Sequence, residues 1–296
     1  MIKRTLFFSN PYHLSLKNRQ LVIDSSNSLT HTTVPVEDIG FVVSDHPQIS
    51  FTMKLMEQLN AYNVAVVFCD SNHLPCSMVL PLDSNHIQTE IFNLQIVASE
   101  PLKKGLWKQT IEAKILNQAA MLEKQGQSAQ DLKNLAKSVK SGDSENREGF
   151  AARLYWQRLF AGDFYRDQFG PPPNHFLNYG YSILRSAVGR SLAGSGLLAT
   201  LGIHHHNRYN SYCLADDIME PYRPYVDEIA FHLHHQNKGV LNLEKAHKAE
   251  LLKIMAVDVA IGELKRPLMV ALSITTASLA RCFAGDSRKI IYPVFE

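Results

Sequence analysis

The residues best suited to chemistry lie in three short segments of the second half of the sequence. Glu148 heads a helical stripe that continues through Ala152, Tyr155 and Leu159. An acid at the head of an apolar stripe is unusual for a solvated glutamate. It also suits a helix N-terminus, where the macrodipole favours negative charge. Both interpretations of Glu148 stay open at this point.

The second segment contains three consecutive histidines, His204, His205 and His206. Neighbouring side chains on a regular element point in different directions, so at most one or two of them belong to a single site. A polar loop is the simpler interpretation of this segment alone. Its position between the Gly-rich stretch 191–201 and a cluster of acids favours a functional role.

That acidic cluster holds Asp217 and Glu220, whose i, i+3 spacing predicts two carboxylates on one helical face. Like charges in this arrangement repel unless a cation lies between them. Carboxylates with one imidazole, from His205, are compatible with Mg²⁺ or Mn²⁺. A solvated acidic turn is the alternative.

Several catalytic motifs are missing from the sequence. There is no HExxH, no adjacent His-Asp pair, no Walker A motif and no GxSxG. Their absence excludes zinc proteases of that type, HD phosphohydrolases, P-loop NTPases and serine hydrolases. No GxGxxG follows a predicted strand, so a dinucleotide site is not expected.

The elements that must position these residues change type near residue 85. Short apolar runs separated by turn residues predict a β region, beginning with a meander of hairpins and including one helix at 50–59. The expected strands are 6–8, 13–16, 20–23, 32–36, 39–43, 64–69 and 78–80. From residue 86 the apolar spacing becomes helical. The expected helices are 87–98, 102–122, 129–138, 145–161, 176–193, 224–235, 243–257 and 267–283.

The sequence therefore predicts an α+β protein with a small N-terminal β domain, 1–85, and a larger all-helical domain, 86–296, joined by a linker at 81–85. The chain has 30 basic and 28 acidic residues. Residues 1–85 contain 5 basic and 7 acidic residues, and residues 86–296 contain 25 basic and 21 acidic residues. The second part is mildly basic, which fits either a solvated face or a phosphate-binding strip. The residues proposed for the strip are Lys103, Lys104 and Lys108 on one helix, with Arg147, Arg153 and Arg166 nearer the acids.

The composition is that of a soluble globular protein, with 45% hydrophobic residues. Four widely spaced cysteines favour free thiols in a reducing compartment. No secretory segment and no run long enough to span a bilayer is visible, so we expect a cytoplasmic protein without a membrane partner.

Three motifs occur in order: Asn146-Arg147-Glu148-Gly149-Phe150-Ala151-Ala152-Arg153-Leu154-Tyr155-Trp156, then Leu177-Asn178-Tyr179-Gly180-Tyr181-Ser182-Ile183-Leu184, and finally Gly202-x-x-His205-x-Asn207 with Asp217-x-x-Glu220-Pro221-x-Arg223-Pro224. Together they closely resemble the CRISPR-associated protein one family, the integrase of spacer acquisition, and most of all its type II members. The resemblance covers essentially the whole chain.

The resemblance implies a metal site of Glu148, His205 and Glu220, which would also be the catalytic residues, with Asp217 as a nearby second acid. Glu stands at 220 where many relatives have Asp. Arg223 matches an arginine expected to position carboxylates or a phosphate. His204 and His206 only flank the matching histidine. His205 is either a metal ligand or a proton shuttle.

The implied reaction is attack of a DNA 3′-OH on a phosphodiester of the CRISPR repeat, with Mg²⁺ or Mn²⁺ stabilising the developing charge. The implied partners are donor and repeat DNA, a second copy of the chain bound through the N-terminal domain, and a CRISPR-associated protein two dimer that completes a heterohexamer. Other proteins of a type II locus are possible partners.

Two other functions compete with this one: a stand-alone metal-dependent nuclease or junction resolvase, and a DNA-binding scaffold with purely structural acids. Against the scaffold stands the shortage of cations near Asp216, Asp217, Glu220 and Asp227, where only Arg223 is close in sequence. On that reasoning, removing one acid should slightly stabilise the metal-free protein.

Overall fold

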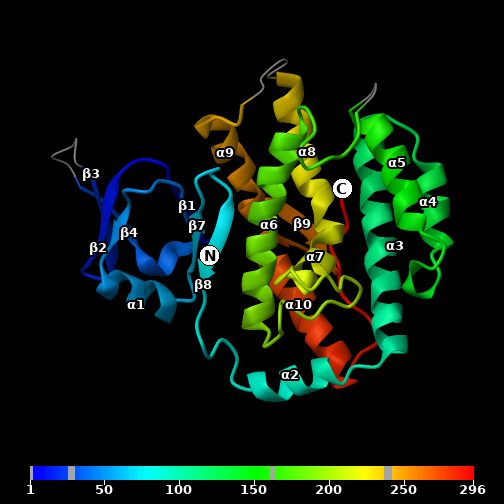
Figure 1. Cartoon of the computed structure of the whole chain (residues 1–296), viewed down its shortest axis with the longest axis horizontal. Coiled ribbons are helices and arrows are strands. Elements are labelled where there is room, and N and C mark those ends of the chain that lie inside the picture. The colour runs from blue at the N-terminus through cyan, green and yellow to red at the C-terminus, as the bar shows by residue number, and fades with distance from the viewer. Residues whose placement is uncertain (1–2, 26–30, 161–163, 237–241) are drawn as a thin grey trace. The chain divides into compact units, whose positions relative to one another are not determined.

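The computed structural model describes residues 3–25, 31–160, 164–236 and 242–296. The chain forms two compact units, Met1–Asp83 and Ser84–Glu296, whose elements are labelled in Figure 1. The first is built from β-strands and one α-helix, and the second is mostly helical. An N-terminal β region followed by a larger helical region was predicted from the sequence, and it is confirmed.

The first unit contains two four-stranded sheets. One has the strand order β1-β5-β7-β8, in which β1, β5 and β7 are parallel and β8 is antiparallel to β7. The other has the order β4-β3-β2-β6. The strands are β1 Arg4–Phe8, β2 Tyr12–Lys17, β3 Gln20–Ser25, β4 Thr32–Pro35, β5 Ile39–Ser44, β6 Ser50–Phe51, β7 Ala65–Cys69 and β8 Pro75–Val79.

Of the meander predicted for 6–8, 13–16 and 20–23, only the antiparallel pair of β2 and β3 is correct. Strand β4 extends this pair by joining β3 in antiparallel order. Strand β1 instead pairs in parallel with β5, so it does not form a hairpin with β2. Pro11 lies between β1 and β2, and proline has no N–H to continue a ladder. The two strands therefore join different sheets.

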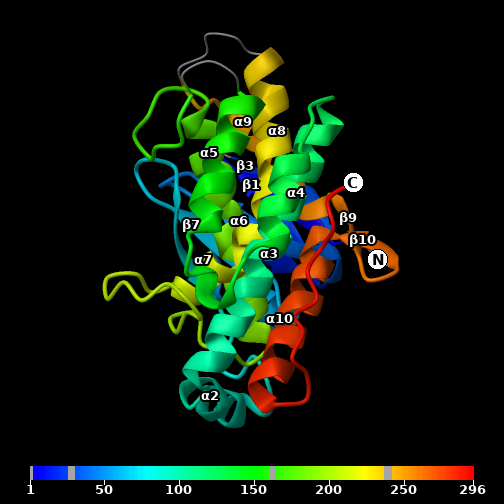
Figure 2. The same cartoon turned by 90° about the vertical axis from the view of Figure 1, so that its right-hand side faces the viewer.

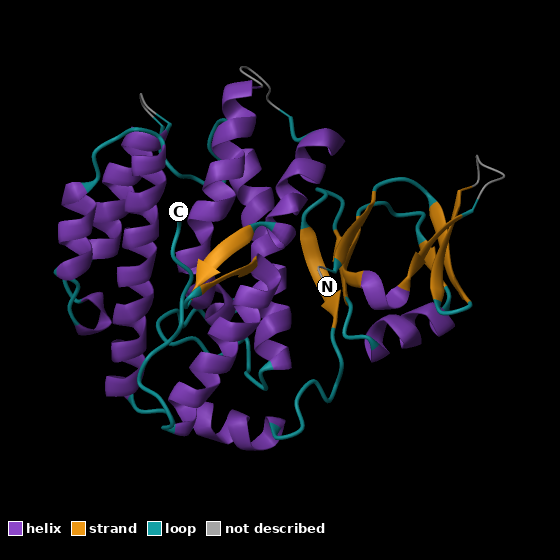
Figure 3. Ribbon diagram, turned by 180° about the vertical axis from the view of Figure 1, so that it is seen from behind, coloured by secondary structure: helices purple, strands orange, loops and turns teal. Residues whose placement is uncertain are grey.

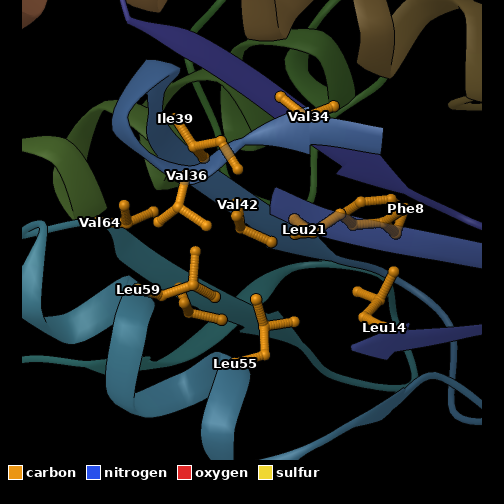
Figure 4. Packing of buried hydrophobic residues seen from close by; sticks show 11 residues of the cluster. Phe8, Leu14, Leu21, Val34, Val36, Ile39, Val42, Leu55, Leu59 and Val64 are labelled. Carbon is orange, nitrogen blue, oxygen red and sulfur yellow. The ribbon is translucent and has the colours of Figure 1, made fainter. Parts of the chain in front are cut away.

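The core of this unit packs helix α1, Met53–Ala61, against both sheets (Figure 4). Leu55 and Leu59, one turn apart on α1, are fully buried, as is Val42 of β5. Thr52 caps α1 by accepting from the N–H of Leu55. Burial of this continuous apolar cluster is what stabilises the unit.

The second unit is built around two long helices, α3 Glu100–Lys124 and α6 Asn174–Gly194. Ser99 caps α3 and Pro101 lies in its first turn, both favourable at a helix start. The other helices are α2 Gln88–Ile96, α4 Gln130–Lys137, α5 Arg147–Leu159, α7 Cys213–Met219, α8 Arg223–Gln236, α9 Lys245–Leu252 and α10 Leu268–Ala284. Short 3₁₀ segments lie at Val36–Asp38 (η1), Ser141–Asp143 (η2), Glu220–Tyr222 (η3) and Lys253–Ala256 (η4).

This unit is not all-helical as predicted. A β-hairpin of β9 Asp258–Ile261 and β10 Leu264–Pro267 lies among its helices (Figure 3). Val259 and Ile261 are buried on one face of β9, and Gly262 supplies the positive φ of the tight turn. Helix α7 agrees with the helical face expected for Asp217, although no bounds were predicted for it. The end of the predicted helix 145–161 falls outside the described residues. In the described parts of the chain, no helix is both long and apolar enough to cross a membrane.

The C-terminal segment runs beside α3 and ties it to the turn that carries Glu220 (Figure 2). Asn117 of α3 donates to the carbonyls of Pro221 at 2.7 Å and Pro293 at 3.0 Å. The side-chain amide oxygen of Asn117, Oδ1, accepts a hydrogen bond from the N–H of Phe295. One buried amide thus fixes α3, η3 and the C-terminal segment together.

Candidate active site

A buried lysine of α3 lies between two of the predicted site residues. The ammonium nitrogen of Lys114 donates to Glu148 Oε1 at 2.5 Å and lies 2.6 Å from Glu220 Oε2. The Lys114 side chain is 9% exposed and that of Glu220 is 5% exposed. Carboxylates from α5 and η3 therefore meet at a single cation supplied by a third element.

Glu148 is placed by the polar residues that begin α5. Asn146 accepts from the N–H of Gly149, and Asp143 accepts from the N–H groups of Arg147 and Glu148. These bonds satisfy N–H groups that have no partner within the helix. They fix the first turn of α5, and the Glu148 side chain remains 27% exposed, within reach of an incoming ligand.

Glu220 is the first residue of η3 and is held by two cations. Arg223 Nη2 lies 2.9 Å from Glu220 Oε1, on the opposite oxygen from Lys114. Burial would raise the pKa of Glu220, but Arg223 and Lys114 outweigh it and hold the pKa below its ordinary value. Burial would likewise lower the pKa of Lys114, but Glu220 and Glu148 raise it. The buried charges are stabilised because they are paired.

Asp217 has different partners from Glu220. Its fully buried carboxylate accepts from the N–H groups of Ile203, His204 and His205 at 2.7, 3.0 and 3.2 Å. It also lies 2.5 Å from His205 Nδ1. Helix α7 ends at Met219, and Glu220 begins the 3₁₀ segment η3 that follows it directly. The sequence predicted one cation shared by Asp217 and Glu220, whereas in the structure Asp217 organises the histidine loop.

This bond determines how His205 is presented. Because Nδ1 is bonded to Asp217, Nε2 is the nitrogen left to bind a ligand or exchange a proton. The hydrogen bond to Asp217 raises the pKa of His205, burial opposes this, and the charges of Asp217 and Glu220 add to the increase. The His205 side chain is 44% exposed.

Trp107 of α3 supports the same loop. Its ring stacks on His204 with centroids 4.1 Å apart and meets the edge of the His205 ring at 5.8 Å. Trp107 precedes Lys114 by two helical turns, so both lie on one face of α3. Glu148 and Glu220 contact Lys114, and His205 contacts Trp107, so all three side chains touch residues of one face of α3.

A pocket of about 420 Å³ opens beside the paired carboxylates. Its wall includes Lys114, Glu148, Arg153, Tyr181, Glu220 and Arg223. Further in, the buried Asp227 carboxylate accepts hydrogen bonds from Tyr155 at 2.8 Å and Tyr181 at 2.5 Å. Burial raises the pKa of Asp227 to about 7, although both hydroxyls oppose this.

Arg223 is fixed by more than its contact with Glu220. Its guanidinium lies over the Tyr181 ring, 4.6 Å from the centroid. The pKa of Arg223 stays above its ordinary value because the charge of Glu220, with those of Tyr181 and nearby acids, outweighs burial. It is therefore a permanent, oriented charge in the pocket wall.

The donor set can be compared with what a hard divalent ion requires. Among the described residues, no three His, Cys, Asp or Glu side chains are grouped closely enough to hold a metal ion. Yet the carboxylates of Glu148 and Glu220 already converge on one cation, and the His205 ring contacts Trp107 on the same helix. Two carboxylates and one imidazole suit Mg²⁺ or Mn²⁺. The residues fit such an ion, with the Lys114 ammonium in the place between the carboxylates.

The three lysines expected to bind DNA all lie on α3 but have different neighbours. Lys103 lines a second pocket of about 370 Å³ with His205, His206 and Arg208. Lys104 is exposed beside η2, and Lys108 lies 3.5 Å from Glu112. Lys104 and Lys108 are spaced i, i+4 and share a face of the helix, and the role of the three lysines in binding DNA stays a prediction.

The arginines differ as well. Arg153 is exposed at the rim of the first pocket, and Arg147 pairs with Glu145 at 2.5 Å. The Arg166 guanidinium donates hydrogen bonds to the side-chain oxygens of Asn174 and Asn178. It therefore stabilises the local structure at the start of α6.

Sequence reasoning missed Lys114, Trp107 and the tyrosine partners of Asp227. Lys114 could have been noticed in the sequence, because it lies on the same helical face as the apolar residues Ile111 and Ile115. The argument that cations were too few near the acids was wrong, because the partners come from elsewhere in the chain. Asp216, for example, pairs with Arg185 of α6 at 2.7 Å.

Comparisons with known proteins cover nearly the whole chain. The family model of CRISPR associated protein Cas1 matches residues 6–256, a range that includes Glu148, His205 and Glu220. The CRISPR-associated endonuclease Cas1 of Neisseria meningitidis serogroup C (strain 8013) is 39% identical over 263 residues, covering 88% of this chain and 86% of the relative.

Solved structures share the fold at low sequence identity. A casposase bound to an integration product superposes with a TM-score of 0.80 at 21% identity, covering 98% of this chain and 92% of that one. A chain of a Cas6-RT-Cas1–Cas2 complex gives a TM-score of 0.72 at 20% identity, covering 99% of this chain and 36% of that one. Taken with the family match and the Neisseria relative, these likenesses lead to one conclusion: the chain belongs to the CRISPR associated protein Cas1 family.

Proposed function

We propose that the protein is a metal-dependent DNA endonuclease and integrase that inserts foreign DNA fragments as new spacers into a CRISPR array. One observation carries the proposal: Glu148 and Glu220 converge on a single cation, Lys114, at the wall of a pocket. His205, oriented by Asp217, contacts Trp107 on the same helix as Lys114. Family membership supports the DNA substrate, since the Neisseria relative is named an endonuclease and the casposase is bound to an integration product.

The proposed reaction is a transesterification. The oxygen of a donor 3′-OH forms a bond to phosphorus in the repeat, and the bond from that phosphorus to the 3′-oxygen of the repeat strand breaks. One phosphodiester replaces another, so no external energy source is needed. The attacking hydroxyl loses a proton, and the leaving oxygen gains one. In hydrolysis, water takes the place of the donor hydroxyl.

Each residue has a distinct part in this proposal. Glu148, Glu220 and His205 would hold Mg²⁺ or Mn²⁺, which when bound polarises a phosphodiester oxygen and stabilises developing negative charge. Asp217 holds His205 with Nε2 outward, available as a ligand or for proton transfer. Arg223 and Arg153 supply positive charge to a phosphate in the pocket.

We also propose DNA, a second copy of this chain and a protein-two dimer as partners, with pairing through the N-terminal unit and the reaction in the cytoplasm. The solved Cas6-RT-Cas1–Cas2 complex supports a partner of the Cas2 type. A sheet-rich unit with open edges suits self-pairing, because pairing covers unbonded strand edges.

A strand-transfer assay tests the function, using a donor with free 3′-OH ends and a repeat-containing target in Mg²⁺ or Mn²⁺. We expect Glu148→Gln and His205→Ala each to abolish strand transfer while duplex binding persists. Glu250→Gln is the matched control, since the Glu250 side chain is half-exposed and its partner in the described structure is Lys253. Strand transfer near the wild-type rate by either site variant would contradict the assignment. Cleavage without joining by the wild type would indicate a plain nuclease or resolvase.

A further inference from the structure

We infer that Lys114 is a built-in cation that holds Glu148 and Glu220 together in the metal-free protein and leaves them when a divalent ion binds. The inference rests on the proposed metal dependence, and it assigns a positioning role to a residue outside the predicted ligand set. Lys114 comes from α3, whereas the two acids come from α5 and η3.

The two carboxylates lie close together because they share one cation. Each presents an oxygen to the same ammonium, at 2.5 and 2.6 Å, and Glu220 is almost fully buried. Without a cation the two acids would repel, and burial would increase the cost. Arg223 neutralises only the other oxygen of Glu220. Among the described residues, Lys114 alone bridges both acids.

A divalent ion that binds both acids must displace the Lys114 ammonium. An ion held by both acids needs the oxygens that Lys114 occupies, and two neighbouring cations in a shielded site repel strongly. A lysine ammonium sits on a flexible four-carbon stem, and Lys114 borders the 420 Å³ pocket, which gives it room to move. Arg223 stays in place because its guanidinium packs on Tyr181. The ammonium is therefore the cation that exchanges with the metal.

Titration of the metal-free protein with Mn²⁺, followed by calorimetry, tests the exchange. Lys114→Met keeps the length of the side chain and removes its charge. We expect this variant to bind Mn²⁺ about tenfold more tightly than wild type, since no competing cation must leave. Its metal-free form should melt at a lower temperature, and Mn²⁺ should raise its Tm more than that of wild type. Lys124→Met is the control on the same helix, because Lys124 pairs with Glu228 and should leave Mn²⁺ affinity unchanged.

Equal or weaker Mn²⁺ binding by Lys114→Met would overturn the inference. Tighter binding without strand transfer by wild type would support the role of Lys114 and contradict the proposed integrase. Absence of Mn²⁺ binding by both proteins would contradict both ideas. If Lys114→Met does not fold, NMR of lysine-labelled wild type gives the answer. The Lys114 ammonium signal should be protected from exchange without metal and lose that protection with Mg²⁺, and an unchanged signal would overturn the inference.

Discussion

The cores of the two units are built on different principles. Of the charged side chains described in the first unit, only Asp45 is buried, and the rest of its interior is almost entirely apolar. Among its described residues, the second unit buries six Asp, Glu, His and Lys side chains: Lys114, Asp217, Glu220, Asp227, His247 and Lys248. Lys114, Asp217, Glu220 and Asp227 all have partners from other segments of the chain.

The second unit therefore carries the unfavourable free energy of burying charged side chains, which the described part of the first unit largely avoids. Apolar burial stabilises a unit without demanding exact geometry, whereas a buried charge destabilises it unless its partners are placed correctly. Such charges collect at functional sites, where reactive groups must be held away from water. Such a concentration of buried charge is present in the second unit, among the residues that the structure describes.

The largest expected effect is loss of stability in Glu220→Ala. The sequence suggested that removing an acid would relieve repulsion and stabilise the metal-free protein slightly. The structure reverses that expectation, because Glu220 is the partner of both Lys114 and Arg223. Leaving two buried cations short of a partner should reduce the free energy of unfolding by about 3 kcal/mol, measured by urea denaturation.

Leu55→Ala is the comparison in the first unit. Leu55 is fully buried in the apolar core, and its truncation should also cost about 3 kcal/mol. The two variants should differ in Mn²⁺ binding, which Glu220→Ala loses and Leu55→Ala retains. A Glu220→Ala protein as stable as wild type would show that Lys114 and Arg223 do not depend on this acid.

Local patterns were enough to predict most of the fold. The buried run of β7 and the stripes of α3, α6 and α10 appear at the spacing that the structure requires. The pairing of β1 with β5 could not be predicted in this way, because parallel partners are chosen by long-range packing. The β9–β10 hairpin was too short to stand out between two helices.

For the candidate site, spacing and resemblance pointed to Glu148, His205 and Glu220. In the structure Glu148 and Glu220 meet at Lys114, and His205 contacts Trp107 of the same helix. The role of Asp217 was not visible, since its partners are backbone N–H groups of a loop. Nor was the role of Lys114, because a lysine in a helix normally extends into solvent. Partners that meet only through tertiary structure leave no local pattern in the sequence.

A smaller effect should appear in the pH dependence of stability. The pKa of Asp227 is about 7 in the folded protein, against an ordinary value of 3.8. Folding therefore takes up a proton between these values, and the stability that this uptake contributes is lost as pH rises toward 7. Between pH 5.5 and 8 the free energy of unfolding should fall by about 2 kcal/mol more in wild type than in Asp227→Asn.

Urea denaturation of both proteins at the two pH values measures this difference. Asp227→Asn is a suitable reference, since it keeps an acceptor for Tyr155 or Tyr181 but cannot ionise. Parallel pH dependence in the two proteins would mean that Asp227 ionises normally. The contrast with the first unit would then rest on the other buried charges.

The smallest effect concerns the exposed charge of α3, where the second unit meets solvent. Lys103 and Lys108 have acidic neighbours only at 3.5 Å, too far for strong hydrogen bonds, so their ammonium groups remain available to phosphates. Each phosphate contact contributes about one unit to the log–log salt slope of DNA binding. Replacing Lys103, Lys104 and Lys108 by Ala should lower that slope by about 1 to 3 and weaken all duplex sequences alike. Of the single changes, Lys103→Ala should have the largest effect, because Lys103 shares a pocket with His205 and Arg208.

Lys54→Ala in the first unit is the control, since Lys54 pairs with Glu57 at 2.8 Å and should not change the slope. Fluorescence anisotropy of a labelled duplex across a salt series measures each slope. An unchanged slope in the triple variant would place the duplex away from α3 and limit the role of this helix to holding the site from within.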